Sequence, residues 1–189
     1  MDLLKKQILA EGSAIAGGII RVDSFLNHQV DPALIDAIAE EFCRRFTGIE
    51  CDRILTVEAS GIAPAVMTAL KLKVPVVFAK KSRPSTSSGK VYTAKVHSFT
   101  KQKDYDITVS ADFIRQGERV IIIDDFLAHG SASTGLIDII HHAGAEVTAI
   151  GIVIEKGFQD GGRILREKGY RVESLAIIEN IEGNTIQFR

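Results

Sequence analysis

The chain has 189 residues, of which 46% are hydrophobic and 25% charged, and its formal net charge is -1 at pH 7. This is enough for one domain with a full core, and the near-neutral charge provides no electrostatic footprint for nucleic acid or an anionic membrane. No apolar run reaches the length of a membrane span, and residues 1–11 predict an amphipathic helix rather than a signal peptide. The two cysteines, Cys43 and Cys51, match no zinc spacing, so we expect free thiols in a reducing cytosol.

The first part of the chain alternates helices with short apolar runs. Asp31 predicts a helix N-cap with Pro32 at the first helical position. One face of this helix is apolar, through Leu34, Ile35, Ile38, Phe42 and Phe46. A buried strand at 54–57, a loop and helix within 58–73 and a strand at 74–80 are then predicted.

The second part of the chain continues the alternation. Apolar runs predict strands at 119–124, 147–155 and 170–176, and residues 184–188 form a last strand paired through a turn. A helix with an apolar face that ends at Gly144 follows the first of these strands, and a helix at 163–169 follows the Gly161–Gly162 pair. Strands alternating with amphipathic helices indicate an α/β fold with a mostly parallel sheet flanked by helices.

Residues 80–95 differ from the rest, because they are rich in Ser, Lys and Gly and show little apolar periodicity. The next two runs, 95–100 and 105–110, alternate polar and apolar residues as a hairpin does. A long loop in a compact domain is either a lid or a surface excursion. Its basic residues favour a mobile lid that covers an anion, although a solvated surface loop remains the alternative.

The stretch from Val120 to Ser133 carries the clearest chemical signal. Its apolar run leads into adjacent carboxylates, Asp124 and Asp125, and then into small residues that begin a helix. Ligands of open α/β sheets bind at the carboxyl ends of the strands, and backbone N–H groups at a helix start bind phosphate. Carboxylates accept hydrogen bonds from hydroxyl groups. The stretch therefore predicts a site for a ribose 5-phosphate.

Two other nucleotide sites fit this stretch less well. A nucleoside triphosphatase needs a Gly-rich loop that ends in Gly-Lys-Ser/Thr, but Leu136 and Ile137 follow Gly135. A dinucleotide fold needs G-x-G-x-x-G after an early strand, and the chain has none. A pair of surface aspartates without a ligand is the purely structural alternative, and the small-residue turn after them argues against it.

Val120–Ser133 resembles the phosphoribosyl-pyrophosphate (PRPP) signature of the type I phosphoribosyltransferases. The segments VDSFLNHQVDP, EASGIAPAVMTALKLKVPVVFAKK, VHSFTKQ and GIVIEKGFQ are similar to those of the bacterial xanthine phosphoribosyltransferases, and the likeness covers nearly all residues. It implies one domain over 1–189, with a small hood from about residues 12–30 and the C-terminal part. It also implies purine salvage by transfer of the phosphoribosyl group of PRPP to xanthine, in a cytoplasmic homodimer. Mg²⁺ would be held mainly by PRPP, with no direct protein ligand.

The resemblance also implies roles for particular residues. Asp124 and Asp125 correspond to the catalytic acceptors of the ribose hydroxyls. The residues that would bind the phosphates of PRPP are Ala128, His129, Gly130, Ser131, Ala132, Glu58, Ala59, Ser60, Gly61, Lys80 and Lys81. Those that would bind xanthine are Ile20, Asn27, Lys156 and Phe158. Where the wider family often has hydroxyl residues this chain has His129 and Ala132, so His129 is either a phosphate contact or a solvated loop residue.

Two alternative functions stay open. The signature alone does not distinguish xanthine from hypoxanthine, guanine or adenine as the acceptor. An ammonium such as that of Lys156 only donates hydrogen bonds, so it suits the exocyclic oxygen of an oxopurine rather than the amino group of adenine. A non-catalytic purine-sensing regulator with a similar domain would need a DNA-binding module, and the first fifty or so residues show no basic recognition helix.

Overall fold

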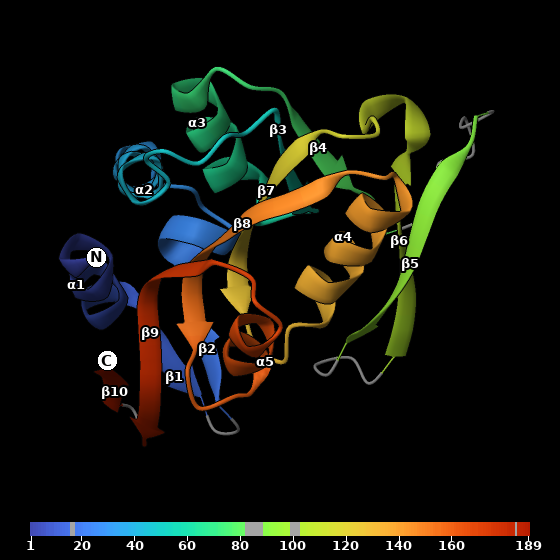
Figure 1. Ribbon diagram of the computed structural model, residues 1–189. Helices are drawn as coiled ribbons and strands as arrows, with labels where there is room; N and C mark the ends of the chain where they lie inside the picture. The colour runs from blue at the N-terminus through green and yellow to red at the C-terminus, as the bar shows by residue number, and fades with distance from the viewer. Residues whose placement is uncertain (16–17, 82–88, 99–102, 184) are drawn as a thin grey trace.

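The computed structural model describes residues 1–15, 18–81, 89–98, 103–183 and 185–189. Its centre is a six-stranded sheet in the order β10-β9-β8-β7-β3-β4, in which only β10 runs antiparallel to its neighbour (Figure 1). The strands are β3 (Arg53–Val57), β4 (Val76–Ala79), β7 (Arg119–Leu127), β8 (Glu146–Lys156), β9 (Val172–Glu182) and β10 (Thr185–Phe188). This confirms the predicted mostly parallel sheet, including the final strand.

Helices cover both faces of this sheet. One face packs against α1 (Asp2–Glu11), α2 (Pro32–Arg45) and α3 (Ile62–Leu72). The other packs against α4 (Ser131–His142) and α5 (Gly161–Glu167). No helix in the described part of the chain is long and apolar enough to cross a membrane.

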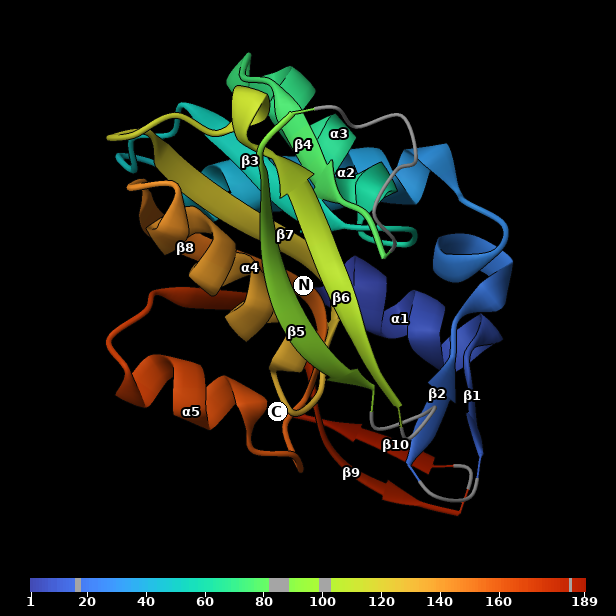
Figure 2. The same ribbon diagram turned by 90° about the vertical axis from the view of Figure 1, so that its right-hand side faces the viewer.

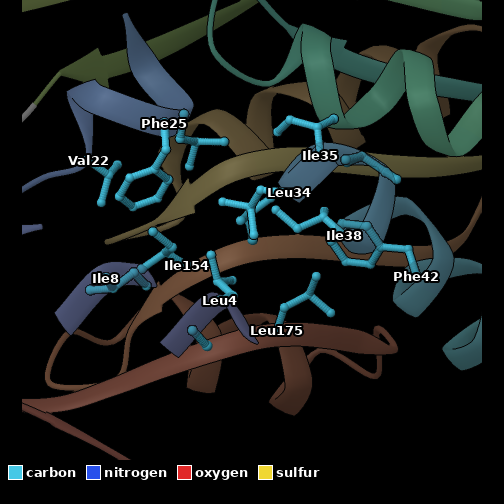
Figure 3. Close-up of a cluster of buried hydrophobic side chains, with 14 of the residues drawn as sticks. Leu4, Ile8, Val22, Phe25, Leu34, Ile35, Ile38, Phe42, Ile154 and Leu175 are labelled. Atoms are coloured by element: carbon cyan, nitrogen blue, oxygen red, sulfur yellow. The ribbon is translucent and has the colours of Figure 1, made fainter. Parts of the chain in front are cut away.

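Helix α2 forms as its sequence predicts. The Asp31 carboxylate accepts hydrogen bonds from the N–H groups of Ala33 and Leu34 at 2.9 and 3.2 Å, and Pro32 occupies the first turn. The predicted apolar face is buried throughout. Leu34, Ile38 and Phe42 belong to the same buried cluster as Leu4 and Ile8 of α1 (Figure 3). These contacts fix the sheet from which the functional site projects.

Two small antiparallel sheets stand beside the main one. Strands β1 (Ser13–Ile15) and β2 (Ile19–Arg21) form a hairpin, which a π-helical turn at Asp23–Asn27 follows. Strands β5 (Val91–Ser98) and β6 (Lys103–Ser110) form the predicted second hairpin, which ends before a 3-10 turn at Ala111–Phe113. Helix α4 packs against β5, so this hairpin covers α4 on the side away from the sheet (Figure 2).

Three sequence predictions need correction. Strand β7 continues through both aspartates to Leu127 instead of ending at Asp124, because Phe126 and Leu127 still pair with β8. Helix α5 includes Gly161 and Gly162, and these positions are glycine because the space beside them is too small for side chains. Residues 91–95 of the predicted lid belong to β5, while 82–88 lie outside the described residues.

Candidate active site

Asp124 and Asp125 lie near the carboxyl end of β7, a central strand between β3 and β8. Asp124 is only 3% exposed, and its Oδ1 accepts a hydrogen bond from the Asp125 N–H at 3.0 Å. Burial, and then the neighbouring charge of Asp125, raise the pKa of Asp124 well above its usual range. Burial also raises the pKa of Asp125. Hydroxyl groups or a cation placed against the pair would favour the ionised carboxylates and so lower both pKa values.

Gly61 brings the loop after β3 onto this pair. A Cβ at position 61 would lie 2.9 Å from Oδ1 of Asp124 and would overlap Oγ1 of Thr56. Thr56 is fully buried, and its hydroxyl has no hydrogen-bond partner among the described residues. The peptide between Glu58 and Ala59 in this loop is cis. Glycine is therefore required here by the close approach of backbone to carboxylate, which the sequence alone did not reveal.

A small-residue turn follows β7 and leads into α4. Gly130 precedes the helix in the left-handed region at φ 81°, and Ser131 is the first helical residue. The first N–H groups of a helix lack partners within the helix and carry positive potential. The segment Ala128–Ala132 lines the same cavity as the carboxylates, and its last residues present the helix start to that cavity.

One cavity of about 330 Å³ joins these groups. Its walls are residues 57–60 and 124–133, together with Lys81, His97 and Tyr105. The Lys81 N–H donates to Oε1 of Glu58 at 2.6 Å, and its ammonium lies 5.8 Å from the centre of the Tyr105 ring. The Lys81 charge lowers the pKa values of both aspartates and so opposes the effect of burial. His97 and Tyr105 were not predicted, because only the pairing of β5 with β6 brings them here.

Lys80 and Lys81, which are neighbours in the sequence, point to different cavities. The backbone of Lys80 pairs with Thr108, with N–H to oxygen distances of 2.9 Å in both directions. Lys80 lines a second cavity of about 590 Å³ beside β4, with Arg53 and Phe113. Alternation along an extended segment sends neighbouring side chains to opposite sides. Of the two lysines, only Lys81 lines the cavity of the carboxylate pair.

The end of β8 places Lys156 beside the β1–β2 hairpin. The Lys156 ammonium donates to the carbonyl oxygen of Gly18 at 3.0 Å and lies 5.9 Å from the centre of the Phe126 ring. Burial lowers the pKa of Lys156. A Cβ on Gly18 would lie 3.2 Å from the Phe158 ring, which is itself 40% exposed. Lys156, Phe158 and Gly18 therefore make one cluster, and Phe126 connects it to the cavity of the aspartates.

The remaining two predicted purine contacts lie in the segment after Gly18. Ile20 belongs to β2 and is 7% exposed in the core. Asn27 ends the π-helical turn, and its buried Oδ1 has no hydrogen-bond partner in the described ranges. A buried amide oxygen without a donor is uncommon in proteins and indicates that a donor is supplied from elsewhere.

His129 is not simply solvated. Its Nδ1 lies 2.9 Å from Oδ1 of Asp160, at the start of α5. The hydrogen bond from His129 lowers the pKa of Asp160. To the two possibilities left open by the sequence, the structure thus adds a third, in which the imidazole bridges the small-residue turn and α5.

Comparisons with known proteins agree with this geometry. Residues 21–188 match the family model described as the phosphoribosyl transferase domain. The chain is 50% identical over 189 residues to a xanthine phosphoribosyltransferase of Oceanobacillus iheyensis, covering 100% of this chain and 97% of that protein. It is 53% identical over 188 residues to the xanthine phosphoribosyltransferase of Moorella thermoacetica, with 100% and 96% covered.

Solved structures show the same fold at much lower identity. An adenine phosphoribosyltransferase from Giardia lamblia, in complex with 9-deazaadenine, superposes with a TM-score of 0.77 at 20% identity, covering 94% of this chain and 98% of that one. The Trypanosoma brucei enzyme gives 0.76 at 18% identity, with 93% and 78% covered. The family model spans nearly the whole chain, and the relatives are about 50% identical to it over nearly their full length. The chain therefore belongs to the phosphoribosyltransferase family.

Proposed function

We propose that the protein transfers the 5-phosphoribosyl group of PRPP to xanthine, giving xanthosine 5′-monophosphate and pyrophosphate. The observation that carries this proposal is the buried carboxylate pair that shares one cavity with a helix-start anion site. A sugar phosphate has both the hydroxyl groups and the phosphate that these two features accept. The names of the relatives at about half identity support xanthine as the acceptor.

The phosphoribosyl end is bound by groups that differ in charge. The N–H groups of residues 128–132 receive the 5′-phosphate, while Asp124 and Asp125 accept hydrogen bonds from the ribose hydroxyls. Residues 58–61 and Lys81 face the leaving pyrophosphate. When the glycosidic bond breaks, positive charge develops on the sugar, and ionised carboxylates beneath it stabilise that charge. Hydroxyl groups that meet the pair let both carboxyls ionise despite their burial.

The purine is recognised at the end of β8. Lys156 exchanges the Gly18 carbonyl for an exocyclic oxygen of xanthine, and its three donors cannot accept a hydrogen bond from an exocyclic amine. Asn27 supplies the amide whose Oδ1 has no donor among the residues that the structure describes. Phe158 packs on the purine face, and Ile20 closes the pocket from the core side. Holding the base in line with the anomeric carbon lowers the reaction barrier as much as any single contact does.

Mg²⁺ is part of the proposal, and the donor set fits an ion held mainly by the substrate. Within the described ranges, no group of three or more His, Cys, Asp or Glu residues could hold a metal. Mg²⁺ binds proteins through one or two carboxylates and completes its shell with phosphate oxygens and water. When bound, the ion neutralises charge on the departing pyrophosphate. Asp124 and Asp125 remain acceptors for the ribose in this arrangement.

We also infer a homodimer in the cytoplasm. Val66 and Leu70 lie one turn apart on α3 and are 47% and 68% exposed, which supports an apolar contact surface there. Both cysteines, which lie within the described residues, carry free thiols, as a reducing compartment requires. Sedimentation of the full chain tests the first inference, and a monomer at micromolar concentration would contradict it.

An assay panel tests the proposed reaction. The protein is mixed with PRPP and Mg²⁺, and nucleotide formation is followed with xanthine, guanine, hypoxanthine or adenine added separately. We expect xanthine to be preferred. Preference for another oxopurine would keep the ribose-phosphate site and overturn the assignment of Lys156 and Asn27 to xanthine. Tight PRPP binding with no turnover of any base would indicate the regulatory alternative.

A further inference from the structure

The start of α5 lies directly against the turn that follows β7. The Gly161 N–H donates to the carbonyl oxygen of Ala128 at 3.1 Å, and the Asp160 carboxylate meets Nδ1 of His129 at 2.9 Å. A Cβ on Gly130 would lie 3.3 Å from Cα of Gly161. Each residue of the turn from Ala128 to Gly130 is therefore in contact with residues 160–161.

No side chain fits between these two segments. A Cβ on Gly161 would lie 2.6 Å from the nitrogen of Gly130 and 2.7 Å from the carbonyl carbon of His129, and it would overlap the Ala128 oxygen. All three atoms belong to the backbone and cannot swing aside. The N–H groups of the turn are thus held in place by backbone packing as well as by the hydrogen bond.

Helix α5 is itself attached to the sheet by an ion pair between the partly exposed Arg166 and the buried Glu155. Both oxygens of Glu155, a residue that is 3% exposed, accept hydrogen bonds from the Arg166 guanidinium at 2.8 and 2.7 Å. The Ser174 hydroxyl, from β9, donates to the same carboxylate. A Cβ on Gly162 would lie 2.6 Å from the carboxyl carbon of Glu155, so the helix sits directly on it. Glu155 immediately precedes Lys156 along β8.

We propose that Asp160 and Gly161 are positioning residues for the 5′-phosphate of PRPP, which clamp the turn 128–130 to the end of β8 that carries the purine contacts. This inference rests on the proposed function, since the turn is the proposed phosphate site. Through the clamp, the phosphate site and Lys156 share a single anchor, Glu155. Their separation is then fixed before the substrate binds, and a preorganised site loses less free energy in ordering itself on binding.

The clamp predicts a selective loss of affinity. Asp160→Ala removes one partner of His129 and should weaken binding of ribose 5-phosphate and of PRPP by about tenfold, as expected for loss of one charge-assisted hydrogen bond. Asp160→Asn keeps an oxygen acceptor and should bind within about threefold of the original protein. Gly161→Ala forces the two backbones apart and should weaken both ligands by about a hundredfold or more. Pyrophosphate binding with Mg²⁺ should change less than about twofold in every variant, because its proposed residues, 58–61 and Lys81, belong to the segments after β3 and β4 rather than to the turn that α5 contacts.

Glu167→Ala is the matched control, because it also removes a carboxylate from α5. The partner of this carboxylate, Arg163, is exposed. Calorimetric titration of the full chain with ribose 5-phosphate, PRPP and pyrophosphate gives the three dissociation constants, and thermal unfolding reports whether each variant is folded. If Gly161→Ala does not fold, Asp160→Ala and Asp160→Asn still decide the question.

The outcomes separate the two proposals. Selective loss of ribose 5-phosphate and PRPP affinity in Asp160→Ala, restored in Asp160→Asn, supports the clamp. Unchanged affinity in Asp160→Ala, or equal losses for ribose 5-phosphate and pyrophosphate, overturns it and leaves the proposed function intact. A wild-type protein that binds neither PRPP nor ribose 5-phosphate overturns the proposed function and the clamp together.

Discussion

The part of the site proposed for the 5′-phosphate and ribose, the phosphate end, is built from one continuous stretch, residues 124–133. The part proposed for xanthine, the purine end, is built from the separated segments 18–27, 126 and 156–158. At the phosphate end, two carboxylates and a helix start line one cavity, and α5 contacts the turn between them. At the purine end, single side chains meet across the sheet. The proposed sugar-phosphate site therefore consists largely of backbone from one segment, while the proposed choice of purine depends on a few replaceable side chains.

The largest effect, on kcat, is expected from the two aspartates that carry the negative charge of the proposed ribose site. Replacing both Asp124 and Asp125 by Asn should lower kcat by about a thousandfold or more, because the ribose hydroxyls and the developing positive charge lose their ionised acceptors. Steady-state kinetics with xanthine and PRPP measure this. Asp138→Asn, at an exposed position on α4, is the control. Near-normal turnover in the double variant would remove the pair from the ribose site.

A smaller and selective effect is expected at the purine end. Lys156→Ala should raise KM for xanthine roughly 10- to 100-fold, the range for losing a hydrogen bond to a charged group, and should leave KM for PRPP within about twofold. Lys168→Ala, on an exposed residue at the end of α5, controls for the loss of a positive charge. Equal changes in the two KM values would place Lys156 outside the purine pocket.

Lys80 and Lys81 can be compared directly, because only Lys81 lines the cavity of the aspartates. Lys81→Ala should raise KM for PRPP by about tenfold, because it removes a cation that faces both aspartates. Lys80→Ala should change it by less than about twofold, since Lys80 lines the other cavity. Initial rates at varied PRPP concentration distinguish them. The reverse order would mean that Lys80 turns toward the substrate.

The smallest effect is on stability. Asp124→Asn should lower the activity but raise the unfolding temperature. The folded-state pKa of Asp124 is raised, chiefly by burial, so its contribution to stability is present at acid pH and lost as pH rises through that pKa. Asn cannot ionise. Asp124→Asn should therefore unfold about 3–6 °C above the wild type at neutral pH, and this difference should shrink toward pH 4. A pH-independent or negative difference in thermal unfolding would contradict the assigned burial of charge.

Much of the fold follows from local chemistry that a sequence displays. The Asp31 cap with Pro32 marked the start of α2, and the apolar spacing marked the face that is buried. The small residues that follow the aspartates likewise indicated an anion site, because a helix start of this kind leaves its N–H groups accessible. Such signals are readable because each arises within a few neighbouring residues.

Features that depend on distant segments were missed or misplaced. Gly161 and Gly162 suggested a break, yet both are helical. They are glycines because the backbone of the 128–130 turn and the Glu155 carboxylate fill the space beside them. His97 and Tyr105 reach the cavity only through hairpin pairing and the packing of β5 on α4. At the purine end, Ile20 and Asn27 could be named only by family resemblance, since nothing local sets them apart.

The proposed placement of the phosphate, the ribose and the base is tested most directly by a crystal structure of the protein with xanthosine 5′-monophosphate bound. We expect the phosphate on the N–H groups of residues 128–132, the ribose hydroxyls on Asp124 and Asp125, and an exocyclic oxygen of the base on Lys156. A phosphate bound in the cavity beside β4, or a base turned away from Lys156, would contradict the account.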